Sequence, residues 1–121
     1  MRHDEERLQT DCVRWFDYQY PSHRLLLHHS PNGGRRDARE GARFKAMGTR
    51  AGFPDLILLL PSIAGNYLAI EMKIDKGRQT ESQKAMQSAI VKAGGSYAVV
   101  RSFDEFRNIV KFWMKNLKNC K

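Results

Sequence analysis

The apolar run at residues 56–60 constrains the fold of this chain more than any other segment. Five consecutive aliphatic residues follow the turn sequence Gly52-Phe53-Pro54 and Asp55, and Pro61 ends the run. A strand that is apolar on both faces is typical of the middle of a sheet whose two sides are both covered. The run therefore predicts a central strand in a layered α/β domain.

Charged residues stand at the start of this strand and at the end of the next predicted one. Asp55 precedes the apolar run, and Glu71 and Lys73 lie in the predicted strand at residues 67–74. Because side chains alternate along a strand, Glu71 and Lys73 share a face, and Met72 points into the core. Two carboxylates at neighbouring strand ends can hold a divalent metal, and a lysine beside them can position an attacking water. A solvated edge strand would also alternate charges, but the apolar strand after Asp55 favours a site.

The rest of the chain alternates between helical and extended patterns. Helices are predicted over residues 3–20, 35–47, 81–93 and from 103 onward, and strands over 24–29, 56–60, 67–74 and 97–101. Thr80 with Gln83 and Ser102 with Glu105 match capping boxes, and Gly94-Gly95 is a helix stop. Residues 75–79 are polar and are expected to be mobile. The order α-β-α-β-β-α-β-α predicts a mixed central β-sheet flanked by helices, in a single domain spanning residues 1–121.

The charge of the chain indicates a polyanionic partner. The formal net charge is +8, and the basic residues cluster between positions 35 and 50 and again after Glu71. A basic surface beside a carboxylate site suits nucleic acid, with arginine side chains on the phosphates. The candidate DNA contacts are Asn32, Arg35, Arg36, Arg39, Arg43, Lys45, Arg50, Lys76 and Arg78.

The cysteines and the apolar runs bound the setting in which the chain acts. Cys12 and Cys120 lack metal-ligand spacing and stand near opposite ends, as expected in a reducing compartment. The longest apolar run is too short to span a bilayer, so no membrane partner is expected. These features predict a cytoplasmic protein.

Several motifs, taken in order, resemble those of one nuclease family. They are EERLQ at residues 5–9, HSPNGG at 29–34, GTRAGFPDL at 48–56, EMK at 71–73, Gln83, and GGSYAVVRS at 94–102. Together they resemble the VRR-NUC domain, the virus-type replication-repair branch of the PD-(D/E)xK nucleases, over nearly the whole chain. One departure is Met86, which stands where an aromatic residue often follows the glutamine and affects packing rather than chemistry.

The resemblance implies a fold, an activity and partners. The expected fold is the restriction-endonuclease-like one. Stand-alone members of this size are similar to phage-encoded endonucleases that use Mg²⁺ or Mn²⁺ and act as homodimers on branched DNA such as Holliday junctions. The implied setting is therefore the cytoplasm of a bacterial host.

The resemblance also assigns roles to individual residues. Asp55 and Glu71 become metal ligands, with the backbone carbonyl of Met72 completing the inner shell. Lys73 contacts the attacking water or the scissile phosphate, and Gln83 is a supporting polar residue beside that lysine.

The first helix carries a further candidate ligand. Glu5 matches the family's N-terminal acidic position and could reach the metal directly or through water. Glu6 is the competing choice, and either residue could simply be a favourable negative charge in a first helical turn.

Other interpretations stay open at this point. A nucleic-acid-binding module without catalysis could keep a nuclease-like fold, and a flap-type, restriction-type or RNA-directed nuclease would carry the same site. His28 and His29 are expected to be structural or to contact phosphate. A dimer surface could include Trp15, Phe16, Tyr18, Phe112 and Trp113, although these residues could equally belong to the core.

Overall fold

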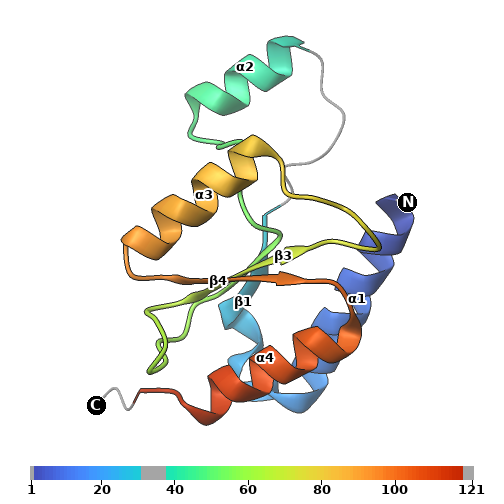
Figure 1. The fold of residues 1–121 in the computed structure, drawn as a ribbon, viewed down its shortest axis with the longest axis vertical. Helices are drawn as coiled ribbons and strands as arrows, with labels where there is room; N and C mark the ends of the chain where they lie inside the picture. Colours follow the sequence, from blue (N-terminus) through green and yellow to red (C-terminus); the bar gives the residue numbers. More distant parts are fainter. Residues whose placement is uncertain (1, 31–37, 119–121) are drawn as a thin grey trace.

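The computed structural model describes residues 2–30 and 38–118, and its fold is a mixed sheet flanked by helices, as predicted (Figure 1). The helices are α1 (Arg2–Gln19), α2 (Ala38–Ala46), α3 (Glu81–Lys92) and α4 (Phe103–Lys115), with a 3₁₀ helix, η1 (Pro21–Leu26), after α1. The strands are β1 (Leu27–His29), β2 (Leu56–Leu58), β3 (Leu68–Met72) and β4 (Ser96–Val100).

The strands lie in the order β1-β2-β3-β4, so β2 is a central strand, as its apolar sequence predicted. β1 and β2 are antiparallel, β2 and β3 are antiparallel, and β3 and β4 are parallel. A parallel pair needs a long crossover, which α3 supplies between β3 and β4. Figure 1 shows α3 on one side of the sheet and α4 on the other.

The main core lies between the sheet and the pair α1 and α4. Every second residue of the central strands packs against the apolar faces of α1 and α4. Trp113 of α4 also donates a hydrogen bond from Nε1 to the Leu60 carbonyl at 2.8 Å. The bond gives the one polar atom of this buried ring a partner. The buried core residues are Cys12, Phe16, Leu56, Leu58, Leu68, Ile70, Met72, Val100, Phe106, Val110 and Trp113.

The strand expected over residues 24–29 is wrong in its first half. Residues Pro21–Leu26 form a 3₁₀ helix, and only Leu27–His29 are extended. Pro21 stands at the start of that helix, where its fixed φ favours a helical turn. Because β1 is short, only a few residues of β2 can pair with it, and β2 ends at Leu58 rather than at residue 60.

The capping box predicted at the start of α3 is present, whereas the one predicted at the start of α4 forms only in part. Both halves of the Thr80–Gln83 capping box form at the start of α3, and Gly94 follows the helix with φ +99°. At α4, the Ser102 hydroxyl accepts from Glu105 N as predicted. The Glu105 carboxylate, however, accepts from Arg101 N at 2.7 Å, one residue before the position that a capping box uses.

Most of the aromatic residues proposed for a dimer surface belong to the core of one chain. Phe16 and Trp113 are 0% and 1% exposed, so neither can form a subunit contact. Trp15 packs edge-on against Tyr20, Phe103 and Phe106. Only Tyr18 and Phe112 remain exposed. Over residues 2–30 and 38–118, no helix combines the length and apolar character needed to cross a membrane.

Candidate active site

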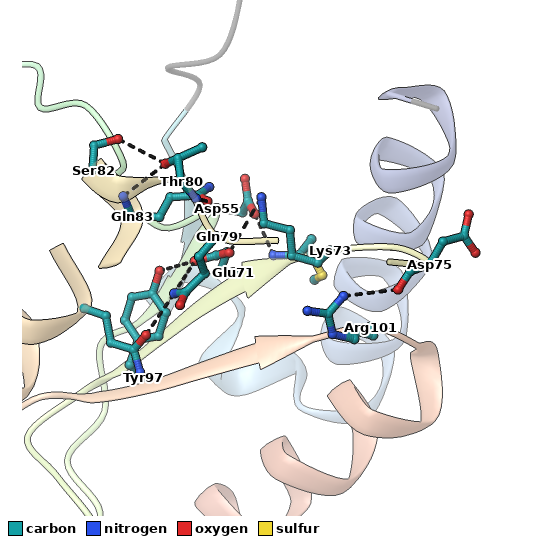
Figure 2. A network of polar contacts seen from close by, with 12 residues as sticks. Asp55, Glu71, Lys73, Asp75, Gln79, Thr80, Ser82, Gln83, Tyr97 and Arg101 are labelled. Atoms are coloured by element: carbon teal, nitrogen blue, oxygen red, sulfur yellow. Dashed lines mark hydrogen bonds and ion pairs between the residues drawn. The ribbon is translucent and has the colours of Figure 1, made fainter. Parts of the chain in front are cut away.

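The pairing of β2 and β3 places Asp55 opposite Glu71. Leu56 pairs with Ile70 in an antiparallel ladder, so the residue before Leu56 lies across from the residue after Ile70. Opposite residues share a face of the sheet, here the face that α3 covers. The Met72 backbone N–H donates to Asp55 Oδ2 at 2.6 Å, which ties the aspartate to the end of β3 (Figure 2).

Lys73 joins this pair from the residue that follows β3. Its Nζ lies 3.8 Å from Glu71 Oε2, and its side chain is only 13% exposed. Its backbone N–H donates to the Val100 carbonyl at 3.0 Å, which fixes the start of the lysine to β4. Met72, between the two charged residues, is buried in the core, so the alternation predicted for this segment is observed.

The backbone of Met72 also faces the aspartate. In an extended strand, the N–H and C=O of one residue point to the same side. Since the Met72 N–H points to Asp55, its carbonyl lies on that side as well. Its role as a metal ligand remains a prediction.

The loop before Asp55 is held against the start of α3. Gly52 has φ +78°, and a Cβ at this position would lie 2.5 Å from the Ser82 carbonyl carbon and oxygen. Only glycine allows both the conformation and this close approach. On the other side, a ring nitrogen of His29, Nδ1, lies 2.7 Å from the Asp55 carbonyl oxygen. Asp55 is therefore positioned by α3, β1 and β3 together.

Glu71 is the most buried charged side chain of the site, at 1% exposed. Its Oε1 accepts hydrogen bonds from the Tyr97 hydroxyl and from Gln79 Nε2, the second at 3.2 Å (Figure 2). Its Oε2 is buried and accepts no hydrogen bond from the residues that the structure describes. A buried carboxylate oxygen without a donor is costly unless a cation is beside it.

The electrostatics of the pair fit a bound cation. Burial raises the pKa of the Asp55 carboxyl, and the nearby Glu71 raises it further, while the Met72 N–H, His29 and Lys73 lower it. Two acidic groups thus share a site in which the protein's own positive charge only partly compensates them. Carboxylate oxygens are also the ligands that Mg²⁺ and Mn²⁺ prefer, so the residues present fit such an ion.

Sequence reasoning missed Gln79 and Tyr97. Gln79 lies in the segment expected to be mobile, but it bonds to Glu71 and to Gln87, and Arg101 donates to the Asp75 carbonyl in the same segment. Tyr97 could have been found only from the register of β3 with β4, which pairs Ala69 with Tyr97 and Glu71 with Val99. With period-two alternation, Tyr97 then points to the same face as Glu71.

Two predicted site residues are not joined to this group. Among the described residues, no group of three His, Cys, Asp or Glu side chains is placed to hold a metal, so the structure does not bring Glu5 together with Asp55 and Glu71 in such a group. Gln83 lies near the site in Figure 2, and its Oε1 accepts from Thr80 N at 2.8 Å in the helix cap. The functional roles of Glu5, its competitor Glu6 and Gln83 stay predictions.

The basic residues predicted to contact DNA are exposed wherever the structure describes them. Three lie on α2, which has no buried residue and lies apart from the sheet, beyond α3, in Figure 1. Asn32, Arg35 and Arg36 lie outside the described residues. The exposed candidates are Arg39, Arg43, Lys45, Arg50, Lys76 and Arg78.

A mixed sheet with two acids and a lysine at the ends of its central strands defines a nuclease-like domain. The family model for the VRR-NUC domain matches residues 3–104, which is most of the chain. A solved structure described as a VRR_NUC domain protein is 30% identical and aligns with a TM-score of 0.81, covering 93% of this chain and 88% of that one. A comparison with curated proteins gave no match. The chain belongs to the VRR-NUC family.

Proposed function

We propose that this chain is a DNA endonuclease that depends on a divalent metal ion. The observation that carries the proposal is the buried Oε2 of Glu71, which accepts no hydrogen bond from the described residues, with Lys73 Nζ 3.8 Å away and Asp55 at the opposite strand position. Asp55 and Glu71 would hold Mg²⁺ or Mn²⁺ with the Met72 carbonyl, and Glu5 would reach it directly or through water. When bound, such an ion polarises the phosphate and makes water a stronger nucleophile.

Lys73 supplies the positively charged side chain of the proposed site. Its ammonium group lies beside the Glu71 carboxylate and would hold either the attacking water or a non-bridging oxygen of the scissile phosphate. Fixing the reacting groups in this way lowers the barrier by pre-orientation and by charge stabilisation. Gln83 would support the same region from the first turn of α3.

The preferred substrate in this proposal is branched DNA, and the Holliday junction is the leading candidate. The described residues form one candidate metal site, whereas resolving a four-way junction needs symmetric cuts in two strands. A homodimer with two-fold symmetry would supply both sites through one self-complementary surface.

The dimer is tested by its mass in solution. Light scattering would then give twice the chain mass of 14.0 kDa. The proposed location is the cytoplasm, where bacterial and phage DNA are found.

Cleavage assays on a panel of nucleic acids test the activity directly. Four-way junction, flap, linear duplex, single-stranded DNA and single-stranded RNA are each incubated with Mg²⁺, with Mn²⁺ or with EDTA. We expect cleavage of the junction with either metal, none in EDTA, and a loss of about two orders of magnitude or more in Glu71→Gln. Glu81→Gln is the matched control, because Glu81 is exposed on α3 and pairs only with Lys84 among the described salt bridges.

The same panel separates the alternatives. Cleavage confined to flaps, to duplex or to RNA would replace the junction proposal with that substrate class. Tight binding to DNA without any cleavage in either metal would favour a non-catalytic binding module. Undiminished cleavage in EDTA would contradict the metal-dependent chemistry.

The basic residues of α2 should govern affinity rather than the rate of cleavage. Arg39, Arg43 and Lys45 are exposed on a helix that stands out from the sheet. Removing one side chain that binds a phosphate should reduce the slope of log affinity against log salt by about 0.9 for duplex DNA. The triple alanine variant should therefore bind junctions more weakly, with a slope about 2 to 3 lower, as measured by fluorescence anisotropy in Ca²⁺ or EDTA.

A second triple variant controls for total charge. Lys92, Lys111 and Lys115 are exposed at the end of α3 and on α4, away from the loop that carries Asp55. Replacing them with alanine removes the same number of charges and should leave the slope nearly unchanged. Equal slopes for both triple variants would mean that α2 does not contact the DNA backbone.

A further inference from the structure

The two oxygens of the Glu71 carboxylate have different surroundings. Oε1 accepts from the Tyr97 hydroxyl and from Gln79 Nε2, whereas Oε2 accepts no hydrogen bond in the described part of the chain. Figure 2 shows Tyr97 and Gln79 on one side of the glutamate, away from Lys73. Lys73 Nζ lies 3.8 Å from Oε2, so this oxygen has an ion-pair neighbour but no hydrogen-bond donor, and it is the oxygen left to bind a metal ion.

The chemistry of the partners fixes the direction of each hydrogen bond. An ionised carboxylate only accepts, so the Gln79 group that faces Glu71 must be its NH₂. The same NH₂ donates to Gln87 Oε1 at 2.8 Å, so its two hydrogens serve two acceptors. Gln87 belongs to α3, and the chain of contacts therefore links the glutamate on β3 to the helix above it.

Tyr97 is suited to be a permanent donor in this network. Its hydroxyl lies within hydrogen-bond distance of Glu71 Oε1, and because an ionised carboxylate can only accept, the phenol is the donor. Its ring is partly buried on β4, in the strand next to Glu71, so its position is set by the parallel register of the sheet.

We infer that Tyr97 and Gln79 are positioning residues that restrict Glu71 to binding a divalent ion through Oε2 alone. The inference rests on the proposed function, in which Glu71 is a metal ligand. Without these donors the carboxylate would be free to rotate and to share its oxygens between the ion and other partners. Hydrogen bonds that orient metal ligands commonly matter by about 10- to 100-fold in affinity.

Manganese binding to the DNA-free protein tests the inference. Isothermal titration calorimetry with MnCl₂ should give a Kd about 10- to 100-fold higher for Tyr97→Phe than for the wild type. Tyr67→Phe is the matched control, because Tyr67 precedes β3 at the end opposite to Glu71. The metal dependence of cleavage gives a second reading: Tyr97→Phe should need more Mn²⁺ to reach half of its maximal rate, and high Mn²⁺ should recover much of that rate.

The outcomes separate a failure of the positioning role from a failure of the proposed function. A wild type that binds no Mn²⁺ would contradict the proposed function itself. A wild type that binds, with Tyr97→Phe binding equally well and responding equally to Mn²⁺, would overturn the positioning role. If Tyr97→Phe has a lower melting temperature than the wild type in EDTA, the variant Gln79→Met replaces it in the test. Gln79 is the second donor to Glu71 Oε1 and lies in the loop between β3 and α3. An unchanged Kd for Mn²⁺ in Gln79→Met would overturn the inference, and a raised Kd would support it.

Discussion

Replacing Lys73 with alanine is expected to reduce the cleavage rate by about two orders of magnitude or more. The side chain of Lys73 is largely buried, and its ammonium group lies beside the Glu71 oxygen that accepts no hydrogen bond from the described residues. Its removal would take away the only side-chain cation placed next to Glu71 among the described salt bridges. Single-turnover cleavage of a four-way junction at saturating Mg²⁺ measures this effect without interference from product release.

Binding to DNA should be nearly unaffected by the same change. The exposed arginines and lysines of α2 and of the loops are the candidate phosphate contacts, whereas Lys73 is mostly covered. Anisotropy titrations in Ca²⁺ should therefore give a Kd within a few-fold of the wild type. A Lys73→Ala enzyme that cleaves at close to the wild-type rate would show that the lysine has no catalytic role.

Two further variants test whether activity depends on the geometry of the ammonium group at residue 73 or only on the presence of a positive charge. Lys73→Arg keeps a positive charge but replaces a compact ammonium with a planar group, so we expect only partial activity. Lys92→Ala removes a lysine from the exposed end of α3 and should be fully active. Urea unfolding of all three variants, in EDTA, shows whether a loss of activity reflects a loss of structure.

Replacing Gly52 with alanine is expected to have the largest effect on stability. An alanine with a positive φ costs about 1–2 kcal/mol. The added Cβ would also lie 2.5 Å from the Ser82 backbone, and overpacking typically costs about 1–3 kcal/mol more. For a domain of this size we expect the melting temperature, followed by circular dichroism, to fall by about 10 °C or more. Because Asp55 lies three residues on, Mn²⁺ affinity should fall as well.

Variants of two other glycines separate the cost of a positive φ from the cost of the steric clash. Gly48 has φ +111°, but nothing lies within 4 Å of its added Cβ, so Gly48→Ala carries the conformational cost without a steric clash. Gly41 lies inside α2 with open space around it, and Gly41→Ala should be neutral or stabilising by up to about 1 kcal/mol. A melting temperature for Gly52→Ala equal to that of the wild type would mean that the loop does not press on α3 in solution.

Local signals in the sequence predicted much of the fold and the centre of the site. Thr80 with Gln83 marked the start of α3, and Gly94 its end, because these signals act within one helical turn. The alternation around Met72 placed Glu71 and Lys73 on one face, and the apolar run after Asp55 identified a central strand. Each of these inferences needed only neighbouring residues.

The parts that were missed depend on contacts between distant segments. Tyr97 reaches Glu71 across the β3–β4 register, and the His29 ring lies next to the Asp55 carbonyl across β1 and β2. No local pattern specifies either pairing. The strand expected before His29 was shortened by Pro21, whose preference for a helical turn outweighed the extended character of the leucines that follow it.

The place of α2 in the chain has a consequence for how such domains could diverge. β1 and β2 are neighbours in the sheet, and His29 at the end of β1 pairs with Leu56 at the start of β2, so the two ends of the connection that carries α2 lie side by side. The pairing of these strands therefore does not depend on the length of the part around α2, provided that residues 52–55, which include the candidate site residue Asp55, are kept. Exchanging only the part around α2 between relatives would give chimeras with the same candidate site and different basic surfaces, so that substrate choice could evolve separately from chemistry.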